Sequence, residues 1–407
     1  MFFTYEVLLV LVSAIALPFF LVAGLFRGKY IANFPERAGF YGTRAQAHDL
    51  WLHAVSVGEA IAARSVMTAI ERLRPQTSVV ITTTTITGQA QAKRLYPNAT
   101  VTYFPFDFSF AVRRFLDHHR PRVFATMETE IWPNVTRIAK SRGVKMLLAN
   151  GRLSDRSFPR YRLFSPLVRR VLRLYDRILA REDLDRDRFT AIGAPRAIVE
   201  TSGNVKFDYE PDETPLAIAP QLLTLIANRP VFILGSTLEG EDEMLIREMT
   251  DEMFVIIAPR KPERFEAVAG LLTGKKFVRR SQLTGAGDIL LLDTIGELAR
   301  IYRYATVAFV GGSLVDAGGH NPIEPAAAGV PVCFGPSMSN FREIASKLLD
   351  DHAAAQVTSA NEAFAFARKM IVDENARTTM SENARRVVAA NRGASERTAQ
   401  RIVELLA

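Results

Sequence analysis

The segment Trp51-Leu-His-Ala-Val-Ser-Val-Gly-Glu59 decides the fold class. Its apolar first half is typical of a buried strand, Gly58 marks a turn, and a helical pattern follows from Ala60 to Leu73. A strand that turns directly into a helix is the first half of a βαβ unit. We therefore expect a parallel α/β sheet in this part of the chain.

Further apolar runs alternate with helical patterns along the rest of the chain, as in parallel sheets covered on both faces. The alternation is interrupted by Tyr209–Pro220, which holds three prolines and several acids and is typical of a linker. We expect two doubly wound, Rossmann-like domains, residues 31–208 and residues 221–407 with a C-terminal helix, joined by linker 209–220. The predicted strands are Asp49–Val55, Ser78–Thr84, Val101–Phe106, Arg122–Met127, Lys145–Ala149 and Arg177–Ala180, then Val231–Gly235, Phe254–Ala258, Ile289–Leu292, Val307–Val310 and Val330–Phe334.

Composition sets the class of protein and of partner. Of the 407 residues, 48% are hydrophobic and 23% charged, which excludes a disordered chain. The formal net charge of +8 favours an acidic partner: a nucleic acid, an anionic membrane surface or an anionic substrate. The single cysteine, Cys333, excludes an intrachain disulfide and lies in an apolar run, as a buried core residue does.

The N-terminus predicts a membrane anchor in residues 1–30. No charged residue occurs from Val7 to Phe26, about the length of a helix that crosses the hydrocarbon layer. Arg27 and Lys29 follow at once, which predicts that the rest of the chain faces the cytoplasm. The alternatives are a monotopic helix in the membrane interface and a cleaved signal peptide, which Glu6 before the apolar run disfavours.

Charged residues follow several predicted strands of the first domain, where ligands of such sheets bind. Glu59 opens a helix, and a carboxylate there can take a proton from an acceptor hydroxyl or simply complement the helix dipole. Glu128 and Glu130 share one side of an extended chain, as functional acids or as solvated loop acids. Lys206, beside the linker, is placed to neutralise a phosphate or carboxylate.

The second domain carries anion-binding signals after its strands. Arg260 is suited to a phosphate or a base edge, or alternatively belongs to a basic helix start. The loops Gly235–Glu241 and Gly311–Glu324 can offer backbone N–H groups to an anion. In the second loop, Asn321 and Glu324 alternatively form a capping box, which leaves the two preceding glycine pairs unexplained.

The sequence predicts no metal site. Asp183-Leu-Asp185 and Asp185-Arg-Asp187 match an Asp-x-Asp motif, but they lie in alternating charge typical of a solvated helix face. The six His residues lack metal-ligand spacing. From Arg152 to Arg188 there are eleven Arg, no Lys and six acids. Together with a membrane anchor, this favours an anionic lipid or lipid-linked phosphate over nucleic acid.

Four motifs together resemble the 3-deoxy-D-manno-octulosonic acid (Kdo) transferase family of lipopolysaccharide biosynthesis. They are His53-Ala-Val-Ser-Val-Gly-Glu59, Glu128-Thr-Glu-Ile-Trp-Pro-Asn134, Ala149-Asn-Gly-Arg-Leu-Ser154 and Gly319-His-Asn-Pro-Ile-Glu324. The resemblance implies an inverting glycosyltransferase of the GT-B fold, with two Rossmann-like domains facing a cleft. It implies transfer of Kdo from CMP-Kdo to a lipid A precursor, lipid IVA, at the cytoplasmic face of the inner membrane, without a cofactor.

The resemblance also implies residue roles. Glu59 is the general base, and Glu130 and Lys206 stabilise the transition state. Leu238 and Lys261 depart from the family pattern, which has His at both positions. CMP leaves without a pyrophosphate to neutralise, which agrees with the lack of a metal pattern. The implied CMP-binding residues are Pro259, Arg260, Ile295, Gly296, Glu297, Asn321, Pro322, Ile323 and Glu324.

Two other functions fit the residues. One is a GT-B transferase that uses a UDP-sugar, which competition between CMP and UDP for the protein distinguishes. The other is a membrane-tethered binding protein without activity, which has no need for Glu59, Glu130 and Lys206 to converge.

Overall fold

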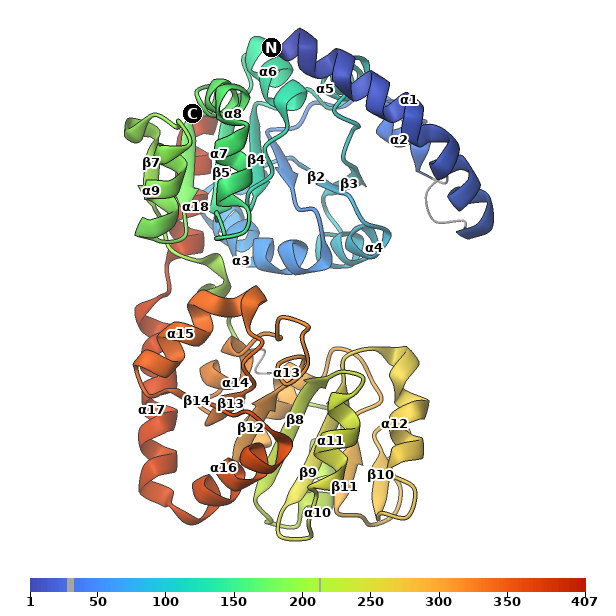
Figure 1. Cartoon of the computed structure of the whole chain (residues 1–407), viewed down its shortest axis with the longest axis vertical. Helices are drawn as coiled ribbons and strands as arrows, with labels where there is room; N and C mark the ends of the chain where they lie inside the picture. Colours follow the sequence, from blue (N-terminus) through green and yellow to red (C-terminus); the bar gives the residue numbers. More distant parts are fainter. Residues whose placement is uncertain (28–32, 212–213) are drawn as a thin grey trace. The chain divides into compact units, whose positions relative to one another are not determined.

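The computed structural model describes residues 1–27, 33–211 and 214–407, with residues 17–27 described as backbone only. The chain divides into two compact units, and each contains one seven-stranded sheet (Figure 1). Unit 1 comprises Met1–Asp208 and Arg392–Ala407, and unit 2 comprises Tyr209–Asn391. All described strand pairings are parallel, so the predicted parallel α/β fold is confirmed in both units.

The sheet of unit 1 has the strand order β3-β2-β1-β4-β5-β6-β7, which is the order of a doubly wound sheet. The central strands β1, β2 and β4 are buried along their whole length because helices cover both faces. The strands are β1 (Leu50–His53), β2 (Val79–Thr83), β3 (Thr100–Tyr103), β4 (Val123–Met127), β5 (Lys145–Gly151), β6 (Arg177–Ala180) and β7 (Val199–Thr201).

Helices flank this sheet between its strands. The longest crossover, α3, buries an alanine-rich stripe with Val66 and Ile70 against the core. The helices are α1 (Phe2–Arg27), α2 (Phe34–Arg37), α3 (Val57–Leu73), α4 (Ile86–Leu95), α5 (Ser109–His119), α6 (Pro133–Ser141), α7 (Phe158–Leu163), α8 (Ser165–Leu172), α9 (Asp183–Ala191) and α18 (Ala394–Leu406), with the 3₁₀ turns η1 (Arg196–Ile198) and η2 (Val205–Asp208).

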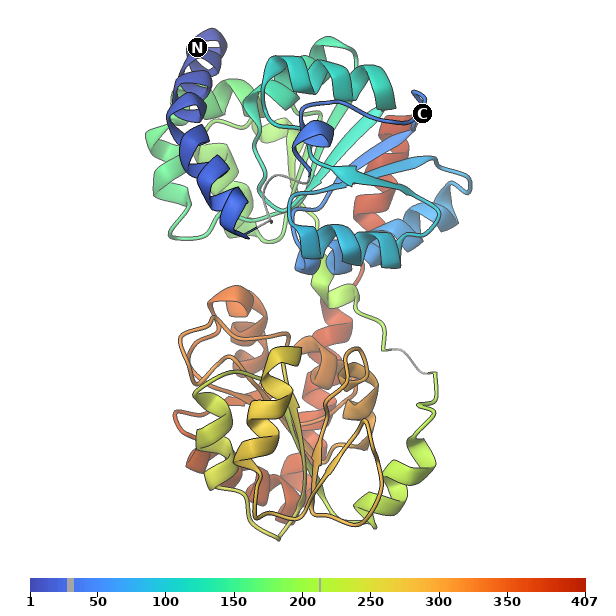
Figure 2. The ribbon, with the colours of Figure 1, turned by 90° about the vertical axis from the view of Figure 1, so that its right-hand side faces the viewer.

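The beginning of α1 packs against the rest of unit 1 (Figure 2). The Glu6 carboxylate accepts hydrogen bonds from the Ser109 backbone N–H at 2.9 Å and from the Asn134 side chain at 2.6 Å. The Tyr5 hydroxyl donates to Asp107 at 2.8 Å. Within the described part of the chain, no helix combines the length and the apolar character needed to cross a membrane. The membrane anchor therefore stays a prediction.

The C-terminal helix α18 belongs to unit 1, although we expected residues 221–407 to form one domain. Its apolar stripe, which includes Ala399 and Ile402, packs in the core beside α3. The Asp208 carboxylate accepts hydrogen bonds from the backbone N–H groups of Gly393 and Ser395 at the start of the helix. An amphipathic pattern shows that a helix has an apolar face, but it does not show which sheet that face covers.

The sheet of unit 2 has the order β10-β11-β9-β8-β12-β13-β14. Its strands are β8 (Val231–Thr237), β9 (Phe254–Pro259), β10 (Phe277–Arg279), β11 (Ile289–Leu291), β12 (Val307–Val310), β13 (Val332–Phe334) and β14 (Ala354–Gln356). Its helices are α10 (Ala219–Ile226), α11 (Glu241–Arg247), α12 (Phe265–Leu271), α13 (Leu298–Ile301), α14 (Ile323–Ala327), α15 (Arg342–Asp350), α16 (Ala360–Val372) and α17 (Glu374–Ala390), with η3 (Pro262–Arg264), η4 (Tyr302–Tyr304) and η5 (Ser339–Phe341).

Candidate active site

A cluster of charged side chains lies at the carboxyl ends of the strands in unit 1. Glu59 is in the first turn of α3 after β1, Glu128 directly follows β4, and Arg181 directly follows β6. Lys206 is in η2 after β7. Because all these strands are parallel, their carboxyl ends lie at the same end of the sheet. The sheet thereby gathers residues from four separate stretches of the sequence.

The Glu59 carboxyl is largely buried and engages the backbone before its own helix. The Val55 N–H donates to Oε2 at 2.7 Å, and the Ser56 hydroxyl lies 3.4 Å from Oε1. Burial raises the pKa of Glu59 to about 8, and the charge of Glu128 adds to this effect. Glu130 raises this pKa further, while the Val55 bond and Lys206 oppose the increase. The carboxyl therefore binds a proton near neutral pH, unlike an anion that only complements a helix dipole.

Glu128 is the centre of the ion pairs in this cluster. Its Oε1 pairs with the Arg181 guanidinium and lies 3.5 Å from Lys206 Nζ. Burial opposes ionisation of Glu128, but the charges of Arg181 and Lys206 outweigh it and hold its pKa below the ordinary value. The Arg181 side chain is only 3% exposed. Removing the Glu128 carboxylate would therefore take this counterion away from the buried Arg181 charge.

The backbone at Glu128 is also unusual, with φ of 59° in the left-handed region. Asn150, which follows the last buried apolar residues of β5, has φ of 55°. The Arg181 Nε donates to the Asn150 carbonyl at 3.1 Å, and the Asn150 side chain accepts from the Val205 N–H at 3.2 Å. Glu128 and Asn150 thus lie at the carboxyl ends of neighbouring strands, and both adopt the left-handed backbone conformation that non-glycine residues rarely take. Such strain is typical of a functional site. The chain is not extended here, so the expectation that Glu128 and Glu130 share one side of an extended strand is wrong.

Glu130 lies beside aromatic side chains. Burial raises the pKa of its carboxyl to about 7, with a contribution from Glu128 and against the opposing effect of Trp132. Tyr161 of α7 is close enough that Glu130 contributes to raising the pKa of its hydroxyl, after burial. The cluster thus holds one carboxylate that stays ionised, Glu128, and two carboxyls that bind protons easily.

Unit 2 places Arg260 beside the loop that begins at Gly311. Arg260 directly follows β9, and its backbone N–H donates to Thr237 at 2.9 Å. Its side chain is exposed, and in the described part of the chain no hydrogen bond or ion pair engages its guanidinium. Burial lowers the pKa of His320 to about 4, and the Arg260 charge contributes. A free guanidinium beside a neutral imidazole suits an anionic ligand.

The loop that ends at α14 differs from a capping box. The Asn321 Oδ1 accepts from the Ile323 N–H at 3.1 Å, and its Nδ2 donates to Glu324 Oε1 at 3.3 Å. The helix begins at Ile323, so Pro322 is its N-cap and the predicted cap at Asn321 is wrong by one residue. Burial raises the pKa of Glu324, against the opposing effects of Asn321 and Arg260. Asn321 thus orients the Glu324 carboxyl.

The third predicted segment, Ile295-Gly-Glu297, is bonded to its own unit. Glu297 accepts hydrogen bonds from Arg280 at 2.8 Å and from the Thr294 hydroxyl. Burial opposes ionisation, but these partners hold the pKa of Glu297 below its ordinary value. Ile295 is 56% exposed, and Gly296 has φ of 91°. The Ile295 side chain is therefore accessible to a ligand, while the Glu297 carboxylate is engaged.

Several residues that matter in these sites were not predicted. Arg181 and the pairing role of Glu128 depend on which strands are neighbours, and no local pattern shows this. Asp185, expected on a solvated face, is buried and accepts a hydrogen bond from the Leu153 N–H at 2.7 Å. His320 was visible in the sequence only as part of the motif that begins at Gly319.

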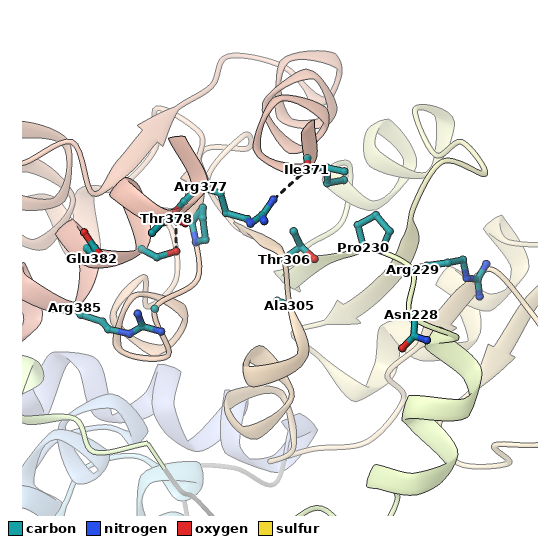
Figure 3. Close-up of a pocket in the computed structure, with 13 residues that line it drawn as sticks. Asn228, Arg229, Pro230, Ala305, Thr306, Ile371, Arg377, Thr378, Glu382 and Arg385 are labelled. Carbon is teal, nitrogen blue, oxygen red and sulfur yellow. Dashed lines mark hydrogen bonds between the residues drawn. The ribbon is translucent and has the colours of Figure 1, made fainter. Parts of the chain in front are cut away.

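A cavity of about 600 Å³ in unit 2 is separate from these residues (Figure 3). Its lining includes Pro230, Thr306 and Pro331, which directly precede β8, β12 and β13. It therefore lies at the amino ends of these strands, whereas Arg260 follows a carboxyl end. Arg377 in its wall is turned to the Ile371 carbonyl at 3.2 Å, so its guanidinium is already engaged.

The fold defines the class of protein. The chain is similar to UDP-GlcNAc 2-epimerase from Neisseria meningitidis bound to UDP-GlcNAc, with a TM-score of 0.59 and 13% identity. The similarity covers 89% of this chain and 99% of that chain. Two Rossmann-like units in this arrangement along the sequence are those of the GT-B fold class.

Sequence comparison gives the family. The family model "3-Deoxy-D-manno-octulosonic-acid transferase (kdotransferase)" matches residues 32–209. The 3-deoxy-D-manno-octulosonic acid transferase of Haemophilus influenzae is 32% identical over 420 residues, covering 99% of this chain and 97% of that protein. The enzyme of the same name from Bordetella pertussis is 37% identical over 396 residues, covering 91% of each chain. The chain belongs to the Kdo transferase family of glycosyltransferases, which confirms the resemblance seen in the motifs.

Proposed function

We propose that this protein transfers Kdo from CMP-Kdo to a lipid A precursor, lipid IVA, in lipopolysaccharide biosynthesis. The observation that carries the proposal is the buried Glu59 carboxyl, whose pKa is raised to about 8 beside Glu128 and Glu130. It occurs in a chain that is 32% and 37% identical to two Kdo transferases over nearly its full length.

Glu59 acts as the general base in the proposed reaction. It removes the proton from the acceptor hydroxyl while that oxygen attacks the anomeric carbon of Kdo. The bond between this carbon and the CMP phosphate breaks on the opposite face, CMP leaves with the bonding electrons, and the configuration inverts. A base is most effective when its pKa lies near the working pH, and the raised pKa of Glu59 meets this condition.

The neighbouring charges stabilise the transition state. Positive charge develops on the sugar as the bond to CMP breaks, and Glu130 offers a carboxyl close to Glu59 for it. Lys206 lies 3.5 Å from Glu128, which holds the ammonium at the same end of the sheet. Lys206 thereby supplies a cation for the negative charge of the substrates.

The donor nucleotide binds to unit 2 in this proposal. The exposed Arg260 guanidinium pairs with the CMP phosphate, and the Asn321–Glu324 segment orients its ribose. Because Glu297 is bonded to Arg280, the Ile295-Gly-Glu297 segment contacts CMP through its backbone and the Ile295 side chain. Pro259 ends β9 and fixes the position from which Arg260 extends.

The same proposal places the protein at the cytoplasmic face of the inner membrane. Leu8, Leu11 and Ile15 of α1 are 59%, 56% and 72% exposed. Leu163 and Phe164, at the junction of α7 and α8, are 76% and 63% exposed among exposed arginines. Exposed apolar side chains flanked by Arg suit an anionic lipid surface, because the apolar groups can enter the lipid and the guanidinium groups can pair with its headgroups. Binding to vesicles that contain anionic lipid, with weak binding to zwitterionic vesicles, is the expected result, and equal binding to both would refute this placement.

The decisive experiment measures Kdo transfer and nucleotide binding separately. The isosteric Glu59→Gln variant should lose transfer from CMP-Kdo while it binds CMP as the wild type does. Glu71→Gln, which removes a charge from the exposed side of the same helix, is the matched control and should remain active. Retained turnover in Glu59→Gln would disprove the base. A preference of the wild type for UDP over CMP would instead favour a UDP-sugar transferase.

A further inference from the structure

The loop that leaves β12 wraps around a carboxylate of its own unit. The backbone N–H groups of Gly312, Ser313 and Leu314 donate to Glu241 at 2.7, 3.1 and 3.0 Å. A fourth donor, the Leu238 N–H, lies 3.3 Å from the same carboxylate. Glu241 is 0% exposed. Convergent N–H groups of this kind form an anion-binding nest, and here a side chain of the protein occupies it.

The loop has a first leg, Gly311–Leu314, and a second leg, Gly319–Glu324, and hydrogen bonds join the two. The Gly319 N–H donates to the Gly312 carbonyl at 2.8 Å, and the His320 N–H donates to the Gly311 carbonyl at 3.2 Å. The second leg includes Asn321–Glu324, the segment proposed to bind the nucleotide. Glu241 is therefore connected to that segment through two successive layers of hydrogen bonds.

The packing leaves this loop little freedom. A Cβ atom added at Gly311 would lie 2.8 Å from the Glu241 Oε2 and 2.5 Å from the Ser236 carbonyl oxygen. Gly312 has φ of 68°, and a Cβ there would lie 3.1 Å from the His320 ring. The glycines thus let the backbone close around the carboxylate. They serve an internal anion, where the sequence alone predicted a site for a ligand.

We propose that Glu241 is a positioning residue for the nucleotide: it fills the nest of Gly312, Ser313 and Leu314 and thereby fixes the leg that carries Asn321–Glu324. The inference rests on the proposed binding of CMP to unit 2. It also means that the donor phosphate cannot use these three N–H groups and needs a side chain such as Arg260. Glu241 itself does not touch the nucleotide.

Chemical rescue tests this role. Glu241→Ala removes the carboxylate but leaves the nest and a space in which acetate fits. We expect its affinity for CMP, measured by calorimetry, to fall at least about tenfold, since four charge-assisted hydrogen bonds are lost. Acetate should restore the affinity in a saturable manner, whereas chloride at the same ionic strength should not. The control Glu239→Ala changes a carboxylate two residues before Glu241 that is 81% exposed, and this variant should bind CMP normally.

Each outcome decides the inference. Unchanged CMP affinity in Glu241→Ala, or a loss that acetate does not restore in a folded variant, would overturn it. If Glu241→Ala does not fold, Glu241→Gln takes its place: its amide can accept two of the four hydrogen bonds, so a partial loss of affinity is expected, and normal affinity would overturn the inference. If the wild type binds another nucleotide in place of CMP, the proposed function fails, and the same comparison with that nucleotide still tests Glu241.

Discussion

The raised pKa of Glu59 predicts that its replacement stabilises the protein at alkaline pH. In the unfolded chain, a Glu ionises near its ordinary pKa of 4.5, whereas the folded protein keeps the Glu59 proton up to about pH 8. Below pH 4.5, Glu59 is protonated in both the folded and the unfolded state, so it adds no pH dependence to the free energy of unfolding. Between these values the folded state binds more protons, so the free energy of unfolding falls as pH rises. Above pH 8 this loss is complete.

The size of the effect follows from the same values. One pKa unit corresponds to about 1.4 kcal/mol, so raising the pKa of Glu59 from 4.5 to about 8 corresponds to about 5 kcal/mol. Glu59→Gln keeps the shape of the side chain and an oxygen for the Val55 N–H, but it does not titrate. We expect wild type and variant to be similarly stable near pH 5, and the variant to be more stable at pH 8.5 by up to about 5 kcal/mol.

Urea unfolding followed by tryptophan fluorescence measures this difference in stability for unit 1. Both tryptophans of the chain, Trp51 and Trp132, lie in unit 1, so their signal reports the unfolding of the unit that holds Glu59. Extrapolated free energies from pH 5 to 9 are compared for the wild type, Glu59→Gln and the control Glu71→Gln. A difference between Glu59→Gln and wild type that stays within about 1 kcal/mol across this range would refute the buried, proton-binding carboxyl.

Three further outcomes are expected. Glu128→Gln removes the carboxylate that pairs with Arg181 and Lys206, so it should lower the free energy of unfolding by about 3 kcal/mol. The same change removes a negative charge that raises the pKa of Glu59, so the acid limb of the pH–activity profile should move to lower pH, and an unmoved limb would contradict this. Arg260→Gln should weaken CMP binding about tenfold or more at a nearly unchanged Tm, because its side chain is exposed; a clearly lowered Tm would show a structural role. Cys333 is fully buried, which raises the pKa of its thiol, so it should react with iodoacetamide only after unfolding; alkylation of the native protein would count against the described core.

The interior of both sheets could be predicted from the sequence, but of the four edge strands only β3 could. Every predicted strand is present, because buried strands of a parallel sheet appear as continuous apolar runs. The three strands without such a run, β7, β10 and β14, are three residues long and lie at sheet edges. At an edge, only one neighbour fixes the backbone, and one face can contact solvent. The apolar pattern is then too short to distinguish a strand from a loop.

The candidate site was predictable where one local pattern carries it. Glu59 follows a strand and a glycine turn, and such a position is visible in a single stretch of sequence. The partnership of Glu128 with Arg181 links residues 53 positions apart and depends on β4, β5 and β6 being neighbours. Glu241 shows the opposite limit. The sequence predicted that the loops Gly235–Glu241 and Gly311–Glu324 offer backbone N–H groups to an anionic ligand, and only the folded structure reveals that Glu241 itself occupies the N–H groups of the second loop.

The charges of the cluster explain why Glu59, rather than Glu128, suits the proposed role of base. Arg181 and Lys206 keep Glu128 ionised, and that fixed negative charge is the second cause, after burial, of the raised pKa of Glu59. At pH 7, a carboxyl with a pKa of about 8 is ionised in roughly one molecule in ten, which costs about 1.4 kcal/mol. In return, the ionised form is a stronger base than an ordinary glutamate. Glu128 cannot serve in this way, because its proton affinity is held low by the two cations. The separation of proton affinities within the cluster therefore supports Glu59 over Glu128 as the proposed base.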